Sequence, residues 1–159
     1  MNTRTQQNAA AKPAQRGASA VEFAFVFPVL FLLVYGVIVY SYVYVLQQSL
    51  TYSAQQSAEA AVAVNPLPSG DFNARVAQRV RAVAVQSFAW LPADQRLRVL
   101  GASGEKVQVA FETIDSDESV VKVTLEFDVP GLFPALELPL VGAVPPLPNR
   151  LRAQAIARI

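Results

Sequence analysis

A single carboxylate stands at the edge of a long apolar run. Glu22 directly precedes Phe23–Leu46, a segment without any charged side chain. A charged group beside lipid is costly, so a functional gain is expected wherever one is kept there. Glu22 is therefore a candidate functional residue. The alternative is that its carboxylate simply lies at the level of the lipid headgroups.

A second group of carboxylates lies in the segment "TIDSDES". Asp115, Asp117 and Glu118 offer the oxygen ligands that calcium prefers. The segment lacks the loop pattern of an EF-hand. We therefore expect a solvated acidic turn here, with a calcium site as the alternative.

Composition excludes several other chemistries. The chain has no Cys and no His, which excludes disulfides, thiol catalysis, Cys/His zinc sites and Ser–His–Asp triads. No glycine-rich phosphate loop is present, and no motif of Ser, Lys, Tyr or carboxylates indicates catalysis. We expect neither an enzyme nor a cofactor. The 13 basic and 12 acidic residues lack the basic surplus of a nucleic-acid binder.

The residues before the apolar run form a basic leader. Met1–Gly17 carries Arg4, Lys12 and Arg16 and no acidic residue. It is too polar to fold alone. It is either a disordered tail or a cytoplasmic leader.

The apolar run has the length of a membrane span. Its 24 residues, positions 23–46, give roughly 36 Å of helix, enough to cross the hydrocarbon core of a bilayer. The basic leader predicts a cytoplasmic N-terminus, and Tyr40, Tyr42 and Tyr44 fit an outer aromatic belt. A cleaved secretory signal would be shorter and would end in a small-x-small site. We expect the span to remain in the mature protein.

The helix is expected to continue beyond the membrane as far as Val64. Small residues recur there at every fourth position, a spacing that forms one stripe on which another helix can pack closely. They are Ser49, Ser53, Ser57 and Ala61. The alternative is that such residues are simply common in Ala-rich helices. "NPLPSG" at 65–70 then ends the helix.

The remaining chain, 71–159, predicts a small extracytoplasmic domain and an α+β fold. Asp71 is a plausible N-cap of a short helix that ends at Leu91-Pro92. Apolar residues then alternate with polar ones, as in half-buried antiparallel strands. These strands are expected at 107–111, 121–129 and 151–159, and Arg96–Leu100 is a candidate shorter strand.

A proline-rich segment separates the last two strands. Val129–Pro148 holds six prolines and one charged residue, Glu137, so neither a central strand nor a long helix is expected. It is either a crossover packed on its own sheet or a loop that binds a partner. We expect the Phe133 end to pack inward. The residues expected to face a partner are Leu138, Leu140 and Val144.

The segment around Glu22 resembles the processing site of type IV prepilins. "GASAVEF" matches the pattern of a glycine followed five residues later by glutamate and then an aromatic residue. The longer stretch "RGASAVEFAFVFPVLFLLVYGV", with its "AVEFA" core and Pro28, is similar to TadE-like minor pilins of tight-adherence (Tad/Flp, type IVc) pilus systems. The C-terminal strands and proline-rich stretch match that family in pattern only.

The resemblance implies a function in pilus assembly. A prepilin peptidase would cut between Gly17 and Ala18, and the new amine of Ala18 would pair with Glu22 of a neighbouring subunit, with Phe23 beside it. The implied partners are the inner membrane, other pilins and minor pilins, and the pilus assembly platform. The C-terminal domain would be periplasmic or extracellular.

Two rival hypotheses remain open. One is a membrane-anchored periplasmic binding or regulatory module whose anchor helix is not cut. The other is a pseudopilin of type II secretion, a family that usually has an aromatic residue where this chain has Ala18.

Overall fold

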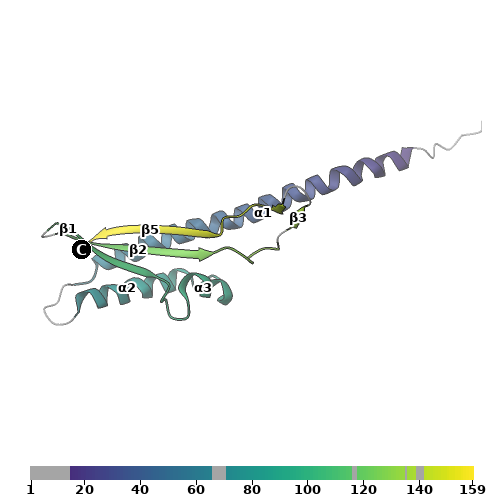
Figure 1. The fold of residues 1–159 in the computed structure, drawn as a ribbon. Coiled ribbons are helices and arrows are strands. Elements are labelled where there is room, and N and C mark those ends of the chain that lie inside the picture. Colours follow the sequence, from purple (N-terminus) through teal and green to yellow (C-terminus); the bar gives the residue numbers. More distant parts are fainter. Residues whose placement is uncertain (1–14, 66–70, 116–117, 135, 139–141) are drawn as a thin grey trace, which may run out of the picture. The chain divides into compact units, whose positions relative to one another are not determined.

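The structure, a computed structural model, describes residues 15–65, 71–115, 118–134, 136–138 and 142–159 (Figure 1). The chain forms two compact units, Met1–Ile38 and Val39–Ile159. The described part of the first unit is entirely helical. All strands lie in the second unit, so the expected α+β fold with a long apolar N-terminal helix is confirmed.

The helix α1 spans Gln15–Val62 and continues through Pro28. Its predicted end at Val64 is two residues too late, which is within ordinary fraying of a helix end. Within α1, Ser19–Val62 is long and apolar enough to cross a membrane, by length and composition.

The helix α2 spans Phe72–Ser87 and begins as predicted. The carboxylate of Asp71 accepts a hydrogen bond from the Ala74 amide at 3.2 Å, which satisfies one of the free N–H groups of the first turn. One face of α2 is buried through Val76, Val80 and Ala84. This face belongs to the hydrophobic core of the second unit.

The expected short strand at Arg96–Leu100 is wrong, because these residues belong to the helix α3, Ala93–Leu100. Leu97 and Val99 alternate with polar residues as in a strand, yet the adjacent pair Val99 and Leu100 is buried. The helix ends at Gly101, whose φ of 72° suits glycine. The Gly101 amide donates to the Leu97 carbonyl at 3.1 Å.

Three antiparallel strands form the main sheet, in the order β1-β2-β5. They are β1 (Gln108–Asp115), β2 (Glu118–Asp128) and β5 (Arg150–Arg158). The central strand β2 pairs Val121 with Phe111 on one side, and it pairs Phe127 with Leu151 on the other. The three strands that alternation predicted are confirmed.

The described residues of the proline-rich segment form no strand of this sheet, in keeping with the expectation that no central strand occurs there. It contains a separate two-stranded ribbon of β3 (Leu136–Leu138) and β4 (Gly142–Val144). Before the ribbon, Phe133 packs edge-on against Tyr42, with ring centroids 5.5 Å apart. The expected inward packing at the Phe133 end is confirmed.

The core of the second unit lies between α2, the sheet and one face of α1. That face repeats at intervals of three and four residues, the spacing of a helix with one buried side. Its buried members include Val43, Leu46, Leu50, Ala54, Ala58 and Ala61. Figure 1 shows β5 running beside α1, and Gln47 Nε2 donates to the Arg152 carbonyl at 3.1 Å.

Candidate functional site

The first turns of α1 carry the residues of the prepilin-like motif. Gly17, Glu22 and Phe23 are exposed. No atom within 4 Å would obstruct a Cβ at Gly17, so packing in the protomer does not require glycine there. Ala18 is helical, and its side chain lies outside what the structure describes.

Aromatic rings form a ladder along one face of the first unit. Phe23, Phe27, Phe31 and Tyr35 follow at intervals of four residues, which places them on the same helix face. Successive ring centroids are 5.3, 6.3 and 6.3 Å apart. The three phenylalanine side chains are at least half exposed. Lipid or another helix is needed to cover such a surface.

The stripe of small residues lies in the second unit. Ser53, Ser57 and Ala61 are 0 % exposed, and Ser49 is half-buried. Close packing on the stripe therefore takes place inside the protomer. Within the described residues, the hydroxyls of Ser53 and Ser57 are buried and have no hydrogen-bond partner.

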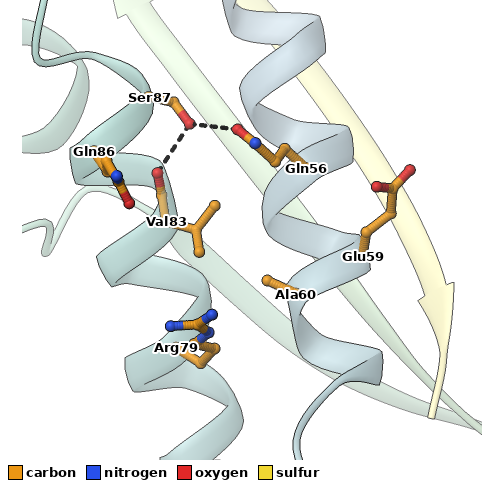
Figure 2. A pocket seen from close by; sticks show the side chains of 7 residues that line it. All are labelled: Gln56, Glu59, Ala60, Arg79, Val83, Gln86 and Ser87. Atoms are coloured by element: carbon orange, nitrogen blue, oxygen red, sulfur yellow. Dashed lines mark hydrogen bonds between the residues drawn. The ribbon is translucent and has the colours of Figure 1, made fainter.

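A groove of about 540 Å³ separates α1 from α2. Figure 2 shows its lining: Gln56, Glu59 and Ala60 from α1, and Arg79, Val83, Gln86 and Ser87 from α2. Ser87 Oγ lies 3.0 Å from Gln56 Oε1 and 2.9 Å from the Val83 carbonyl. The charged residues of the lining are Glu59 from α1 and Arg79 from α2.

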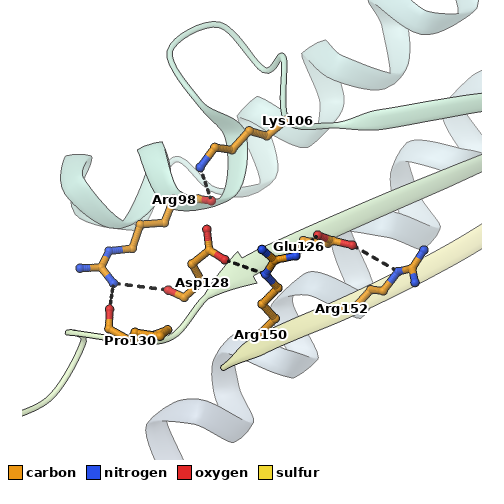
Figure 3. A network of polar contacts seen from close by, with 7 residues as sticks. All are labelled: Arg98, Lys106, Glu126, Asp128, Pro130, Arg150 and Arg152. Atoms are coloured by element: carbon orange, nitrogen blue, oxygen red, sulfur yellow. Dashed lines mark hydrogen bonds and ion pairs between the residues drawn. The ribbon is translucent and has the colours of Figure 1, made fainter. Parts of the chain in front are cut away.

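A polar network joins α3 to the ends of β2 and β5 (Figure 3). Arg98 Nη1 donates to the carbonyl of Pro130 at 2.7 Å and to that of Asp128 at 3.3 Å. On β5, Arg150 lies 3.2 Å from Asp128, and Arg152 lies 3.5 Å from Glu126. These ion pairs are exposed and stabilise the fold by at most about 1 kcal/mol each. Arg98 fixes the start of the proline-rich segment.

Glu105 closes the loop after α3. Its carboxylate accepts hydrogen bonds from the amides of Ser103 at 2.6 Å and Ala102 at 2.7 Å. These bonds favour the charged form and hold the pKa of Glu105 below its ordinary value. A side chain at Gly101 would collide with this carboxylate. The carboxylate of Glu105 therefore holds the loop between α3 and β1 in place.

The expected partner loop is described only in part. Val144 is half-buried at the end of β4. Leu138 lies in β3, but its side chain is outside what the structure describes, and Leu140 is wholly outside it.

Metal binding has no support in the described residues. Among them, no group of three His, Cys, Asp or Glu side chains could hold a metal ion. Asp117 and the side chains of Asp115 and Glu118 lie outside the described part, so the calcium alternative remains a prediction.

Sequence reasoning missed Arg98 and Glu105. Arg98 lies in α3, and Glu105 lies in the loop that follows α3. The sequence signals of this helix were Pro92 before it, Asp94 in its first turn and Gly101 after it. These signals could have identified the helix, and with it the side of α3 that carries Arg98.

Comparison with known proteins identifies the N-terminal segment. Residues 17–59 match the family model described as TadE-like protein. The match begins at Gly17, includes Glu22 and Phe23, and covers most of α1. Neither the curated proteins nor the solved structures gave a match.

Proposed function

We propose that this chain, whose residues 17–59 are TadE-like, is a minor pilin (pseudopilin) of a tight-adherence pilus. The family match is the observation that carries the proposal. The coarser conclusion, a component related to the Tad pilus, follows from the match itself. The finer role is non-enzymatic participation in assembly of the fibre for adherence to surfaces.

The proposal divides the chain into three parts. Residues 1–17 are a basic leader that prepilin peptidase removes on the cytoplasmic side. Residues 18–64 contain the pilin-type helix, which ends at Val62 and whose first half crosses the inner membrane. Residues 71–159 form the domain on the periplasmic or extracellular side. The length and apolar composition of α1 support this arrangement.

Glu22 serves assembly in this proposal. The carboxylate is exposed, and the exposed residues that follow it along α1 as far as Ile38 are all apolar. In a bundle of such helices, the new amine of Ala18 on a neighbouring subunit pairs with Glu22, because two lone charges in an apolar interior cost far more than a pair. The pair also fixes the axial register between subunits, with Phe23 packed beside it.

Contacts between subunits are assigned to surfaces that the protomer leaves open. Ser53, Ser57 and Ala61 are buried within the chain, so the packing stripe serves the protomer's own domain. The apolar face of Phe23–Ile38 is the helix surface that neighbouring pilins cover. Leu138, Leu140 and Val144 are proposed to contact a partner pilin.

The test is N-terminal sequencing of the membrane-extracted protein, expressed with its prepilin peptidase. We expect the mature chain to begin at Ala18. The Gly17→Ala variant should keep its leader, because the cut depends on the glycine, and its domain should melt at the unchanged temperature. A native protein that begins at Met1 would refute the pilin proposal and leave an uncut membrane-anchored module.

A second test isolates Glu22. Glu22→Ala should prevent incorporation into the pilus without changing thermal unfolding of the domain. Glu59→Ala is the matched control, because Glu59 is an exposed carboxylate of the same helix outside the motif. Normal piliation by the Glu22→Ala variant would contradict the pairing of Glu22 with the amine.

A further inference from the structure

The apolar part of α1 that lies outside the folded domain is shorter than a bilayer. Packing of the domain begins at Val39, which is 0 % exposed, so the uncharged helix free of the domain is Phe23–Ile38. These residues give about 24 Å of helix. The hydrocarbon core is about 30 Å thick, so the span must extend about four residues further, to Tyr42. A tilted helix would need still more residues.

The proline-rich segment lies beside the helix at this level. Tyr40 donates its hydroxyl hydrogen to the Pro146 carbonyl at 3.0 Å. Two residues on, the Tyr42 ring packs against Phe133, and the Tyr42 hydroxyl donates to Gln95 Oε1 at 2.6 Å. The domain thus reaches the point on the helix where the hydrocarbon core must end.

The surfaces at this level have the composition of a membrane interface. Tyr40, Tyr44 and Val45 are 47 %, 64 % and 49 % exposed. Together with Leu151 they line an open apolar groove of about 660 Å³. Tyrosine prefers the boundary between hydrocarbon and water, because its ring is apolar and its hydroxyl is polar.

The neighbouring segment continues this surface. Pro146 and Pro148 are exposed, and the whole segment 129–148 has one charged residue, Glu137. The charged residues Arg150 and Arg152 follow this segment in the sequence, at the start of β5 (Figure 3). These arginines, paired with Glu126 and Asp128, belong at the depth of headgroups and water.

We propose that Pro146–Pro148 and the groove lined by Tyr40, Tyr44, Val45 and Leu151 form a lipid-contacting surface, seated in the outer headgroup region of the phospholipid bilayer that α1 crosses. Lipid is the occupant because this surface continues the apolar span along the same helix and makes up the length that the span lacks. The inference rests on the membrane anchorage of the proposed function, and its test separates the two.

The experiment places a single tryptophan as a depth probe in the full-length chain. Trp90 is the only tryptophan and is replaced by Phe. The probe is then introduced as Pro146→Trp, with Pro148→Trp as a second variant should the first unfold. The variants are reconstituted into phosphatidylcholine vesicles whose acyl chains are brominated near the headgroup, brominated near the methyl end, or not brominated. Bromine quenches tryptophan emission on contact.

Two reference positions define the scale. Phe31→Trp reports the span itself. Ile156→Trp is the matched control, because Ile156 is 62 % exposed but lies about 20 Å further along β5 from Arg150, at 3.3 Å per residue. Unfolding by circular dichroism shows which variants keep the fold.

We expect headgroup-proximal bromine to quench tryptophan at 146 or 148 strongly, deep bromine to quench it weakly, and tryptophan at 156 to be unaffected. If Phe31→Trp is quenched but both proline positions are not, the anchorage stands and the lipid-contacting surface is refuted. If Ile156→Trp is quenched equally, the domain adsorbs without the proposed orientation. If no position is quenched, the membrane anchorage itself fails.

Discussion

Two buried serines of α1 offer the sharpest test of how the domain is packed. The side chains of Ser53 and Ser57 are 0 % exposed, and their hydroxyls have no hydrogen-bond partner within the described residues. A buried hydroxyl that has lost water without gaining a partner opposes folding. Replacement by alanine removes this hydroxyl and little volume, so each variant should be more stable than the natural chain.

The magnitude follows from two contributions. Leaving a buried polar group unpaired costs about 1–3 kcal/mol, and alanine is the better helix former by about 0.5 kcal/mol. A small loss of packing offsets part of this gain. Ser57→Ala should therefore raise the free energy of unfolding by about 1–2 kcal/mol. For a chain of this size, each kcal/mol raises the melting temperature by about 2–4 °C. The two serines are one turn apart, so their effects need not add.

The assay is thermal and denaturant unfolding of the full chain in detergent micelles, followed by circular dichroism. Ser49→Ala is the matched control, because Ser49 donates to the Val45 carbonyl at 2.9 Å and is half-buried. We expect little change or a slight loss of stability from it. A clear loss of stability in Ser53→Ala and Ser57→Ala would refute the reasoning and indicate that the hydroxyls have a partner, such as an ordered water.

Three further predictions concern the second unit. Asp71→Ala should lower the free energy of unfolding by about 1 kcal/mol, because the helix cap is lost, whereas Asp71→Asn should retain most of it; denaturant titration measures both. Phe127→Ala should cost about 3–5 kcal/mol in the same titration, because Phe127 is fully buried in the central strand, and a cost below 1 kcal/mol would contradict its place in the core. Glu105 has a pKa lowered by its amide hydrogen bonds, so the stability it contributes is present above its ordinary pKa of 4.5 and is lost as pH falls through the lower folded-state value. Between pH 6 and pH 3, the melting temperature should therefore fall less steeply with falling pH for Glu105→Gln than for the natural chain. Identical slopes of melting temperature against pH would count against this role.

The long helix and the main sheet could be predicted because their signals are local. The apolar run predicts α1, and the prolines after Val64 predict its C-terminal end to within two residues. Strict alternation in Val121–Val129 predicts a half-buried strand, and β2 occupies that place. In contrast, α3 is only eight residues long, too short to show a helical period, and alternation at Leu97 and Val99 indicated a strand instead.

The role of the serine stripe could not be decided from the sequence. The spacing of Ser53, Ser57 and Ala61 shows that they share one helix face, but not which chain covers it. That depends on contacts with elements far along the chain. Arg98 was missed for the same reason, since its acceptors at Asp128 and Pro130 are 30 and 32 residues away.

The pairing of α1 with β5 has a consequence for the kinetics of folding. Gln47 and Arg152 are separated by 105 positions, and Tyr40 and Pro146 by 106. Contacts of such high contact order form late. At elongation rates of about 5–20 residues per second, roughly 5–20 s pass between synthesis of the helix and of the strand that pairs with it. Throughout this interval the part of the core face of α1 that packs on β5 is uncovered. The residues of this core face beyond Leu50 are alanines and serines. They expose less apolar surface on the nascent chain than leucines or valines would, and so favour aggregation less.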